Sequence, residues 1–224
     1  MKISSSSDDI QSIKVVLVGE SGTGKTSIIQ KYCKDVFTDD ANTTLGCANE
    51  TKVIHLSNQK QIKLNLWDTA GQETFRSLNK IFYKDAQIVI LVYDITSCKS
   101  FQEIVNYWYY ETKSHISNDA GKYMYVYIYM YLMILVIGIL GNKSDLFMKG
   151  TVNESEAQQF ADENELLFQL VSAKLNNSCI DMFFKEITEK CLSVINANNN
   201  NNYKHKRTVK LKGSKSNKTK KQCC

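Results

Sequence analysis

The chain has 224 residues, a formal net charge of +5 at pH 7 and 43% hydrophobic residues. This length suits one domain with tails and is enough to bury a sizeable core. The seven cysteines are odd in number and contain no C-x-x-C pair, so they exclude a structural metal site of that type and indicate a reducing compartment.

The positive charge is concentrated at the C-terminus. Residues 203–224 contain nine lysines and arginines and no acid, whereas the rest of the chain has 19 basic and 23 acidic residues, a net charge of −4. A basic tail on an acidic domain suggests an anionic partner such as membrane lipid or nucleic acid. Because the tail has no interleaved aromatic residues, we expect no nucleic-acid partner.

Composition divides the chain into three parts. Residues 1–12 are rich in Ser and Asp and are predicted to be a disordered arm. Residues 13–196 are predicted to form the globular domain. Residues 197–224 are predicted to be an Asn-rich and basic tail, in which the five asparagines at 198–202 are a polar spacer without packing value.

A phosphate-binding loop is predicted directly after the first strand, Ile13–Val18. The loop reads GESGTGKT from residue 19 and fits G-x-x-x-x-G-K-[ST], and a helix is expected after it to about Lys34. Glycines let the backbone approach phosphate, while the loop N–H groups and the helix N-terminus face an anion. Lys25 would reach the β- and γ-phosphates, and the Thr26 hydroxyl would ligate Mg²⁺. The residues expected to bind the phosphates are Gly19, Ser21, Gly22, Thr23, Gly24, Lys25, Thr26 and Ser27.

The following elements alternate between strand and helix. The expected segments are a loop at 35–49, strands Glu50–Leu56, Gln61–Trp67 and Ala86–Tyr93, a helix Lys99–Lys113 with Phe101, Ile104, Val105 and Trp108 on one side, a strand Ile134–Leu140, a helix Asn153–Asn164, a strand Leu166–Val171 and a closing helix Ile180–Ile195. This order predicts an α/β fold in which helices cover both faces of a mainly parallel, six-stranded sheet. Ligands of such sheets bind at the carboxyl ends of the strands.

A second phosphate-side motif follows the strand that ends at Trp67. Asp68-Thr69-Ala70-Gly71 places a carboxylate where phosphate-loop enzymes keep a group on the Mg²⁺ side. Asp and Gly also occur in ordinary turns, so the motif gains its meaning from the upstream loop.

Together, five separated motifs over about residues 12–196 resemble a small GTPase of the Ras superfamily, and a Rab most of all. The resemblance implies that Asn142-Lys143-Ser144-Asp145 recognises guanine, with the Asp145 carboxylate accepting from N1–H and the 2-amino group. It also implies that Ser172, Ala173 and Lys174 form the loop that reads the guanine O6, and that Phe37 lies against the base.

The same resemblance implies a switch driven by GTP hydrolysis. Thr44 and Asp68 would join Thr26 around Mg²⁺, Gly71 would donate its N–H to the γ-phosphate, and Gln72 would orient the attacking water. Hydrolysis would be slow and would be accelerated by a GTPase-activating protein. The other expected partners are a guanine nucleotide exchange factor, a GDP-dissociation inhibitor and trafficking effectors, and the protein is expected to be a monomer that cycles between GTP and GDP.

Two positions depart from the Rab pattern. Asn49 stands where Rabs have a Phe that joins two further aromatic residues, here Trp67 and Phe82, in an effector patch. Thr74 stands where Rabs usually have Arg. Loss of a large apolar side chain at position 49 is expected to weaken or redirect effector binding by roughly 1–3 kcal/mol.

The chain ends in Cys223-Cys224, which resembles the Rab acceptor for two geranylgeranyl groups. Two lipids beside a basic segment would hold the protein on an anionic leaflet. The expected location is therefore the cytoplasmic face of endomembranes, with a cytosolic pool.

Residues 123–140 are uncharged and long enough for a membrane-span candidate, but Tyr recurs at every second position from 123 to 131. A spanning helix has no reason for that period, whereas a strand or a dinucleotide repeat in an AT-rich gene would produce it. Our hypothesis is that about residues 121–133 are translated from a retained intron. A genuine insertion would be an exposed, aggregation-prone extension at the sheet edge.

Three other functions remain open at this stage. A Ras- or Rho-type signalling GTPase is disfavoured by the terminal Cys-Cys, and an ATP-using phosphate-loop enzyme is disfavoured by Asp145. A membrane-associated scaffold would result if the insertion has destroyed nucleotide binding.

Overall fold

The computed structural model of the protein describes residues 10–39, 47–69, 79–117, 136–175 and 178–212. The strands are β1 (Gln11–Val18), β2 (Cys47–His55), β3 (Gln61–Thr69), β4 (Ile88–Asp94), β5 (Val136–Asn142) and β6 (Leu167–Leu170). The α-helices are α1 (Lys25–Lys34), α2 (Asn79–Tyr83), α3 (Cys98–Glu103), α4 (Tyr109–Ser117), α6 (Glu154–Glu163) and α7 (Cys179–Lys212), with a π-helical segment η2 (Ile104–Trp108) and a 3₁₀ segment η4 (Ser144–Lys149).

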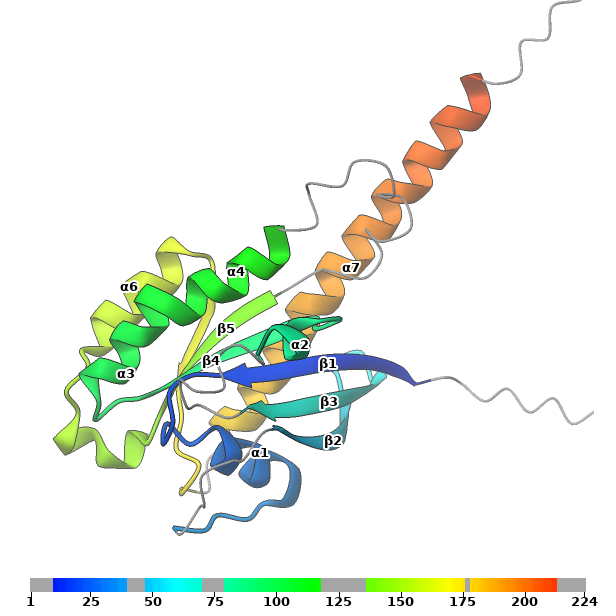
Figure 1. Cartoon of the computed structure of the whole chain (residues 1–224). Coiled ribbons are helices and arrows are strands. Elements are labelled where there is room, and N and C mark those ends of the chain that lie inside the picture. Colours follow the sequence, from blue (N-terminus) through cyan, green and yellow to red (C-terminus); the bar gives the residue numbers. More distant parts are fainter. Residues whose placement is uncertain (1–9, 40–46, 70–78, 118–135, 176–177, 213–224) are drawn as a thin grey trace, which may run out of the picture. The chain divides into compact units, whose positions relative to one another are not determined.

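The six strands form one sheet in the order β2-β3-β1-β4-β5-β6 (Figure 1). The pairings are parallel except for β2 with β3, which is antiparallel. The predicted mainly parallel, six-stranded α/β architecture is therefore confirmed.

Burial explains why the strand segments could be recognised. Every residue of β4 and β5 is buried, as expected for central parallel strands covered on both faces. In β3, by contrast, Ile62, Leu64 and Leu66 are fully buried, while Lys63 between them is exposed. The period of two marks a strand that is covered on one face only.

One face of the sheet is covered by α1 and the first turns of α7. Tyr32 of α1 stacks on Phe184 of α7 with a distance of 4.0 Å between ring centroids. Lys52 of β2 joins them, because its Nζ donates to the Tyr32 carbonyl at 2.6 Å and lies 3.0 Å from Asp181. Gly138 of β5 permits this close packing, since a Cβ there would lie 2.7 Å from both Phe183 Cζ and Ile187 Cδ1 of α7.

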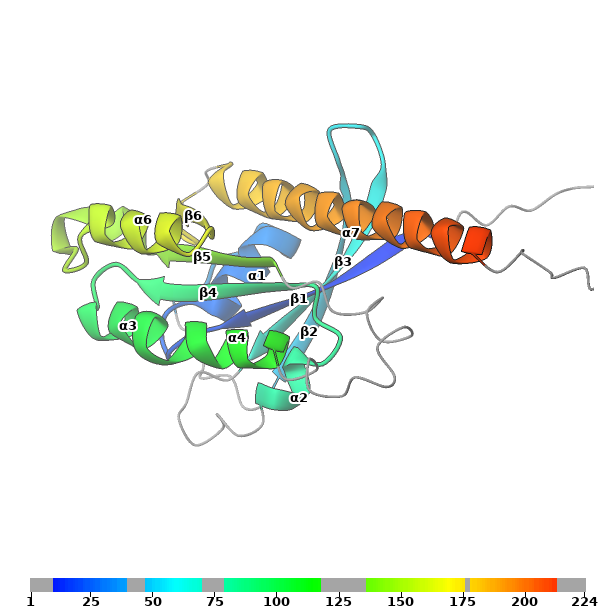
Figure 2. The same ribbon diagram turned by 90° about the horizontal axis from the view of Figure 1, so that it is seen from above.

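The opposite face is covered by α3, η2, α4 and α6. Figure 2 shows α1 on one side of the strands and α3 and α4 on the other. Trp108 and Tyr109 are buried in this layer together with Ala157 and Ala161 of α6, in a cluster that reaches down to β4 and β5. Asn153 caps α6 by accepting a hydrogen bond from the Ser155 N–H at 3.0 Å, as its position before the helix predicts.

Several predicted bounds were wrong. The loop expected at 35–49 ends earlier, since Cys47–Asn49 already pair with β3. Asp68, expected just after a strand, is the penultimate residue of β3. The continuous helix expected at 99–113 contains the π-helical turn η2, which no hydrophobic pattern announces. β5 begins at Val136 and extends to Asn142, two residues beyond the expected end.

The closing helix is longer than predicted. It was expected to end at Ile195, but α7 continues through the asparagine run to Lys212. The chain divides into two compact units, residues 1–191 and 192–224.

The insertion hypothesis for residues 121–133 lies outside the described residues, which stop at 117 and resume at 136. In the described part of the chain, we find no helix whose length and hydrophobicity would suffice to span a bilayer.

Candidate functional site

The phosphate loop follows β1 and has a backbone that requires glycine. Gly24 has a left-handed φ of 89°, and a Cβ there would lie 2.2 Å from the amide nitrogen of Asn142. At Gly19 a Cβ would lie 2.1 Å from the carbonyl oxygen of Val92 in β4. The loop is therefore held against the ends of two neighbouring strands, which only residues without side chains permit.

Two side chains at the start of α1 define the phosphate end of the site. Lys25 is 5% exposed, and its ammonium donates to the carbonyl oxygens of Gly19 (2.8 Å) and Glu20 (2.9 Å). Burial lowers the pKa of Lys25 to about 8, against the opposing effect of the nearby Asp68 carboxylate. The Thr26 hydroxyl donates to Asp68 at 2.6 Å, which brings the two motifs predicted on the Mg²⁺ side together.

Asn142, the last residue of β5, links the two ends of the site. It is 2% exposed, its amide nitrogen donates to the Thr23 carbonyl at 2.9 Å, and its amide oxygen accepts from the Ala173 N–H at 3.2 Å. The phosphate loop and the Ser172–Lys174 loop are thus fixed to the same side chain.

The opposite end of the site is built around Asp145 and Ser172. The Ser172 hydroxyl donates to Asp145 at 2.6 Å and accepts from the backbone N–H groups of Lys174 (3.2 Å) and Leu175 (3.1 Å). Lys143, in a left-handed conformation with φ of 67°, forms an ion pair of 2.6 Å with Asp94 at the end of β4. These contacts fix where the loops after β5 and β6 present their polar groups.

The loop after α1 forms the remaining wall. Phe37 lies in this loop, and the Lys174 ammonium is 5.7 Å from the centroid of its ring. Lys174 also lies 3.1 Å from Asp39, although both side chains of this ion pair are more than half exposed. An aromatic ring and two exposed charges therefore border the site on this side.

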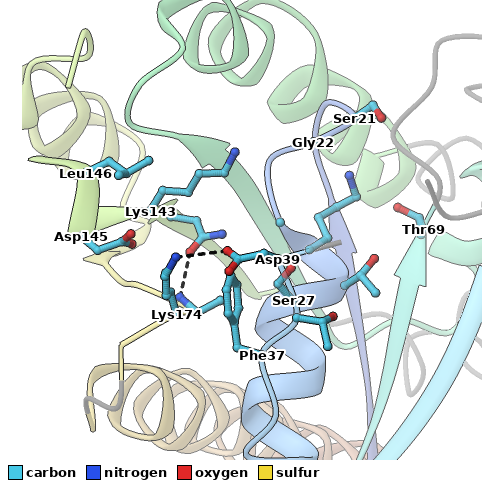
Figure 3. A pocket seen from close by; sticks show the side chains of 16 residues that line it. Ser21, Gly22, Ser27, Phe37, Asp39, Thr69, Lys143, Asp145, Leu146 and Lys174 are labelled. Atoms are coloured by element: carbon cyan, nitrogen blue, oxygen red, sulfur yellow. Dashed lines mark hydrogen bonds and ion pairs between the residues drawn. The ribbon is translucent and has the colours of Figure 1, made fainter. Parts of the chain in front are cut away.

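Most of these groups line one cavity of about 390 Å³, a volume in the usual range for small-molecule sites (Figure 3). Of the predicted residues, the cavity is lined by Ser21, Gly22, Gly24, Lys25, Thr26, Ser27, Phe37, Asn142, Lys143, Asp145, Ala173 and Lys174. Gly19, Thr23, Ser172 and Asp68 are not in this lining but are bonded to residues that are. Thr44, Gly71, Gln72, Cys223 and Cys224 lie outside the described residues.

The sequence did not identify four residues of the lining, which are Thr38, Asp39, Thr69 and Leu146. Each is within two residues of one that was predicted, and that proximity is the only signal by which they could have been found. Thr69 in addition donates its hydroxyl to the Leu17 carbonyl at 2.7 Å, which joins β3 to β1 beside the cavity.

The residues at the phosphate end fit Mg²⁺. Hydroxyl and carboxylate oxygens are the ligands that this ion prefers, and the Thr26 and Asp68 oxygens lie 2.6 Å apart. The glycine backbone and the Lys25 ammonium next to them suit the polyphosphate that usually supplies further ligands to Mg²⁺.

Comparison with known proteins agrees with this geometry. The sequence profile of the Ras family matches residues 14–193. The chain is 35% identical over 180 residues to the Ras-related protein Rab-10 of Caenorhabditis elegans, an alignment that covers 80% of this chain and 81% of that protein. It is 36% identical over 177 residues to Rab-5A of Dictyostelium discoideum, with 79% of each chain covered, and 34% identical over 185 residues to Rab-2B of the same organism, with 83% of each covered.

Proposed function

The chain belongs to the Ras family as a Rab-like small GTPase, and from this premise we propose how its own residues bind and read the nucleotide. As a Rab-like GTPase it hydrolyses GTP and acts in vesicle traffic. The observation that carries the proposal is the double hydrogen bond of Asn142, which holds the phosphate loop and the Ser172–Lys174 loop around one cavity.

We assign recognition of guanine to Asp145. Its carboxylate is oriented by the Ser172 hydroxyl at 2.6 Å. A carboxylate accepts hydrogen bonds and cannot donate them, so it suits the N1–H and 2-amino donors of guanine. Adenine has no donors at these positions, which disfavours an ATP-using enzyme. The Ala173 N–H next to Asn142 belongs to the loop proposed to face the guanine O6.

The phosphates are proposed to bind the backbone of residues 19–24, the N-terminus of α1 and the Lys25 ammonium. When bound, Mg²⁺ neutralises charge that develops on the β- and γ-phosphate oxygens. Thr26 and Asp68 would hold the ion, and Thr44 is proposed as a further ligand. Gly71 and Gln72 are proposed to contact the γ-phosphate and to orient the attacking water.

Regulators and effectors of the Rab type act on this chain. We propose that the regulators include an exchange factor, a GTPase-activating protein and a GDP-dissociation inhibitor. We also propose that the protein is a monomer. The effector patch differs from the usual one. Exposed Asn49 lies directly opposite Trp67 in the β2–β3 pairing, and the Trp67 and Phe82 ring centroids are 6.2 Å apart. The amide side chain of Asn49 favours binding of effectors that offer hydrogen-bonding groups at this position.

Membrane attachment is proposed to use prenyl groups on Cys223 and Cys224. The basic residues before these thiols supply a second, electrostatic contact with the anionic cytoplasmic leaflet of an endomembrane. The GDP-dissociation inhibitor would maintain the cytosolic pool. The terminal Cys-Cys pair continues to disfavour a Ras- or Rho-type signalling role.

Nucleotide binding tests the proposal directly. The full-length chain and a variant lacking residues 121–133 are expected to retain fluorescent GDP with micromolar or tighter affinity in Mg²⁺ and to release it faster in EDTA. Asp145→Asn is expected to lose GDP and to gain xanthosine diphosphate, because the Asn amide donates to the carbonyl that replaces the 2-amino group. Asp162→Asn, on the exposed face of α6, is the matched control.

Failure of both the full-length chain and the shortened variant to bind GDP would contradict the switch function and leave the scaffold as the explanation. Binding by the shortened variant alone would show that the insertion blocks an otherwise functional site.

A further inference from the structure

Asp94 is a buried carboxylate beside the nucleotide cavity that the proposed mechanism does not use. It ends β4, is 8% exposed, and is paired in register with Asn142 at the end of β5. Among the described residues it is not part of the cavity lining. Any effect on the nucleotide must therefore pass through a neighbouring residue.

That neighbour is Lys143. One carboxylate oxygen of Asp94 lies 2.6 Å from the Lys143 ammonium. The other accepts from both the N–H and the hydroxyl of Thr96, at 2.8 and 2.7 Å. Two short hydrogen bonds from Thr96 hold the carboxylate independently of the lysine, so Asp94 acts as a fixed anchor.

Lys143 needs an anchor because its side chain is long and 35% exposed. A free lysine side chain loses rotamer freedom when a ligand packs on it, and this loss weakens binding. The ion pair orders the chain before the ligand arrives. Since Lys143 lines the cavity next to Asp145, an ordered alkyl chain presents a ready surface to the bound base.

The anchor is itself attached to the start of α3. The Asp94 N–H donates to the Ser100 hydroxyl at 3.0 Å, and the Ser97 N–H donates to the Asp94 carbonyl at 2.9 Å. Ser97 is the N-cap of α3. Asp94 therefore connects the first turn of α3 to Lys143, which lines the cavity.

We propose that Asp94 is a positioning residue that keeps the nucleotide bound by holding Lys143 in place. This inference rests on the proposed nucleotide-binding function. It assigns Asp94 a role in retention of the nucleotide and none in hydrolysis, because its carboxylate contacts Lys143 and Thr96, neither of which is proposed to contact the γ-phosphate.

The test measures release of fluorescent GDP from full-length protein in excess unlabelled GDP and Mg²⁺. Asp94→Asn, which keeps the shape and removes the charge, is expected to release GDP about tenfold faster, the factor typical of a lost charge-assisted hydrogen bond. The rate constant for single-turnover hydrolysis of preloaded GTP is expected to change by less than about twofold. Asp162→Asn, the same substitution at an exposed residue of α6, is the matched control and is expected to release GDP like the wild type.

A double-mutant cycle separates positioning from a general structural effect. Lys143→Met is expected to speed release, and Asp94→Asn combined with it should add no further increase. Lys143→Arg can still reach Asp94 and is expected to retain GDP within about threefold of wild type. If Asp94→Asn cannot be purified, the comparison of Lys143→Arg with Lys143→Met decides alone.

Additive effects of Asp94→Asn and Lys143→Met, or equal release from Lys143→Arg and Lys143→Met, would overturn the inference. Unchanged release from Asp94→Asn would do the same. A wild-type chain that binds no GDP would instead refute the proposed function, so the two failures are distinguishable.

Discussion

Lys25 is a buried charge at the start of α1. Its ammonium is nearly buried and donates to two backbone carbonyls of its own loop. These acceptors are weaker than the phosphate oxygens for which the loop is built. Burial lowers the pKa of Lys25 to about 8.

This pKa predicts a pH dependence of nucleotide binding. A bound polyphosphate favours the charged amine, so above about pH 8 the free protein must take up a proton to bind. The association constant for GDP should therefore fall as pH rises above about 8, by up to about tenfold per pH unit, and should not depend on Lys25 below that pH. Isothermal titration calorimetry in buffers of different ionisation enthalpy measures both the affinity and the proton uptake.

Lys25→Arg is the control, because a guanidinium keeps its charge throughout this range. The affinity of Lys25→Arg for GDP is expected to be lower than that of the wild type. The part of its pH dependence that comes from Lys25 should be absent. The same slope in wild type and Lys25→Arg would show that another group, such as the base itself, accounts for the dependence.

Asn142 contributes to stability as well as to the site. Asn142→Ala would leave the buried Thr23 carbonyl and the Ala173 N–H without their partner, and each such loss costs about 1–3 kcal/mol. We expect the nucleotide-free protein to lose roughly 2–4 kcal/mol of unfolding free energy, measured by urea denaturation. Asn164→Ala, which removes a half-buried bond to the Phe160 carbonyl at a helix end, should cost less than about 1.5 kcal/mol. Equal losses would mean that the bridge between the loops adds nothing.

At the scale of elements, hydrophobic patterns predicted the parts that bury apolar surface. The central strands were recognisable as unbroken apolar runs, and the caps of α6 followed from Asn153 and the acids after it. Motif spacing placed most of the cavity lining for the same reason, since a parallel sheet brings the loops after its strands to one edge.

The errors arose where local pattern carries no information. Cys47–Asn49 have no alternating apolar pattern and become a strand only because β3 supplies hydrogen-bond partners. Asp94 could not be assigned, because its role depends on Lys143, 49 positions later in the chain. Side-chain hydrogen bonds between distant segments leave no periodicity in the sequence.

The π-helical turn η2 is the clearest of these cases. The predicted α-helical face was Phe101, Ile104, Val105 and Trp108, yet Tyr109 is 3% exposed and Val105 only partly buried. A π turn accommodates one extra residue and so rotates the residues that follow it. The result is that both Trp108 and Tyr109 face the core.

Deletion of Asn106, an exposed residue of η2, should therefore convert the segment to a regular α-helix. After the deletion, the buried Trp108 and Tyr109 would lie three and four positions after Ile104, as an α-helix requires. We expect the melting temperature to remain within about 4 °C of wild type, as judged by circular dichroism, corresponding to less than about 1 kcal/mol.

A matched deletion of Glu156, exposed in the regular helix α6, should be strongly destabilising because it rotates Ala161 away from the core. Comparable losses for the two deletions would mean that η2 does not absorb an extra residue.

In the molecule as a whole, the nucleotide site and the cluster of basic residues lie in different parts of the chain. The nucleotide site lies within residues 1–191, in the part of the chain that carries net negative charge. The basic residues and the terminal thiols lie within residues 192–224. The proposed membrane attachment and the nucleotide site therefore use different residues of the chain.

The division predicts that attachment and nucleotide binding can be separated by mutation. Replacing both Cys223 and Cys224 by Ser removes the lipid acceptors, and the basic residues alone give weak, salt-sensitive contact with anionic lipid. The tagged double variant should be diffuse in the cytosol and absent from the membrane fraction, with GDP affinity unchanged. Cys98→Ser, which replaces an exposed thiol of the domain, is the control and should remain on membranes. A double variant that still sediments with membranes at high salt would show that an interaction other than prenylation holds the protein there.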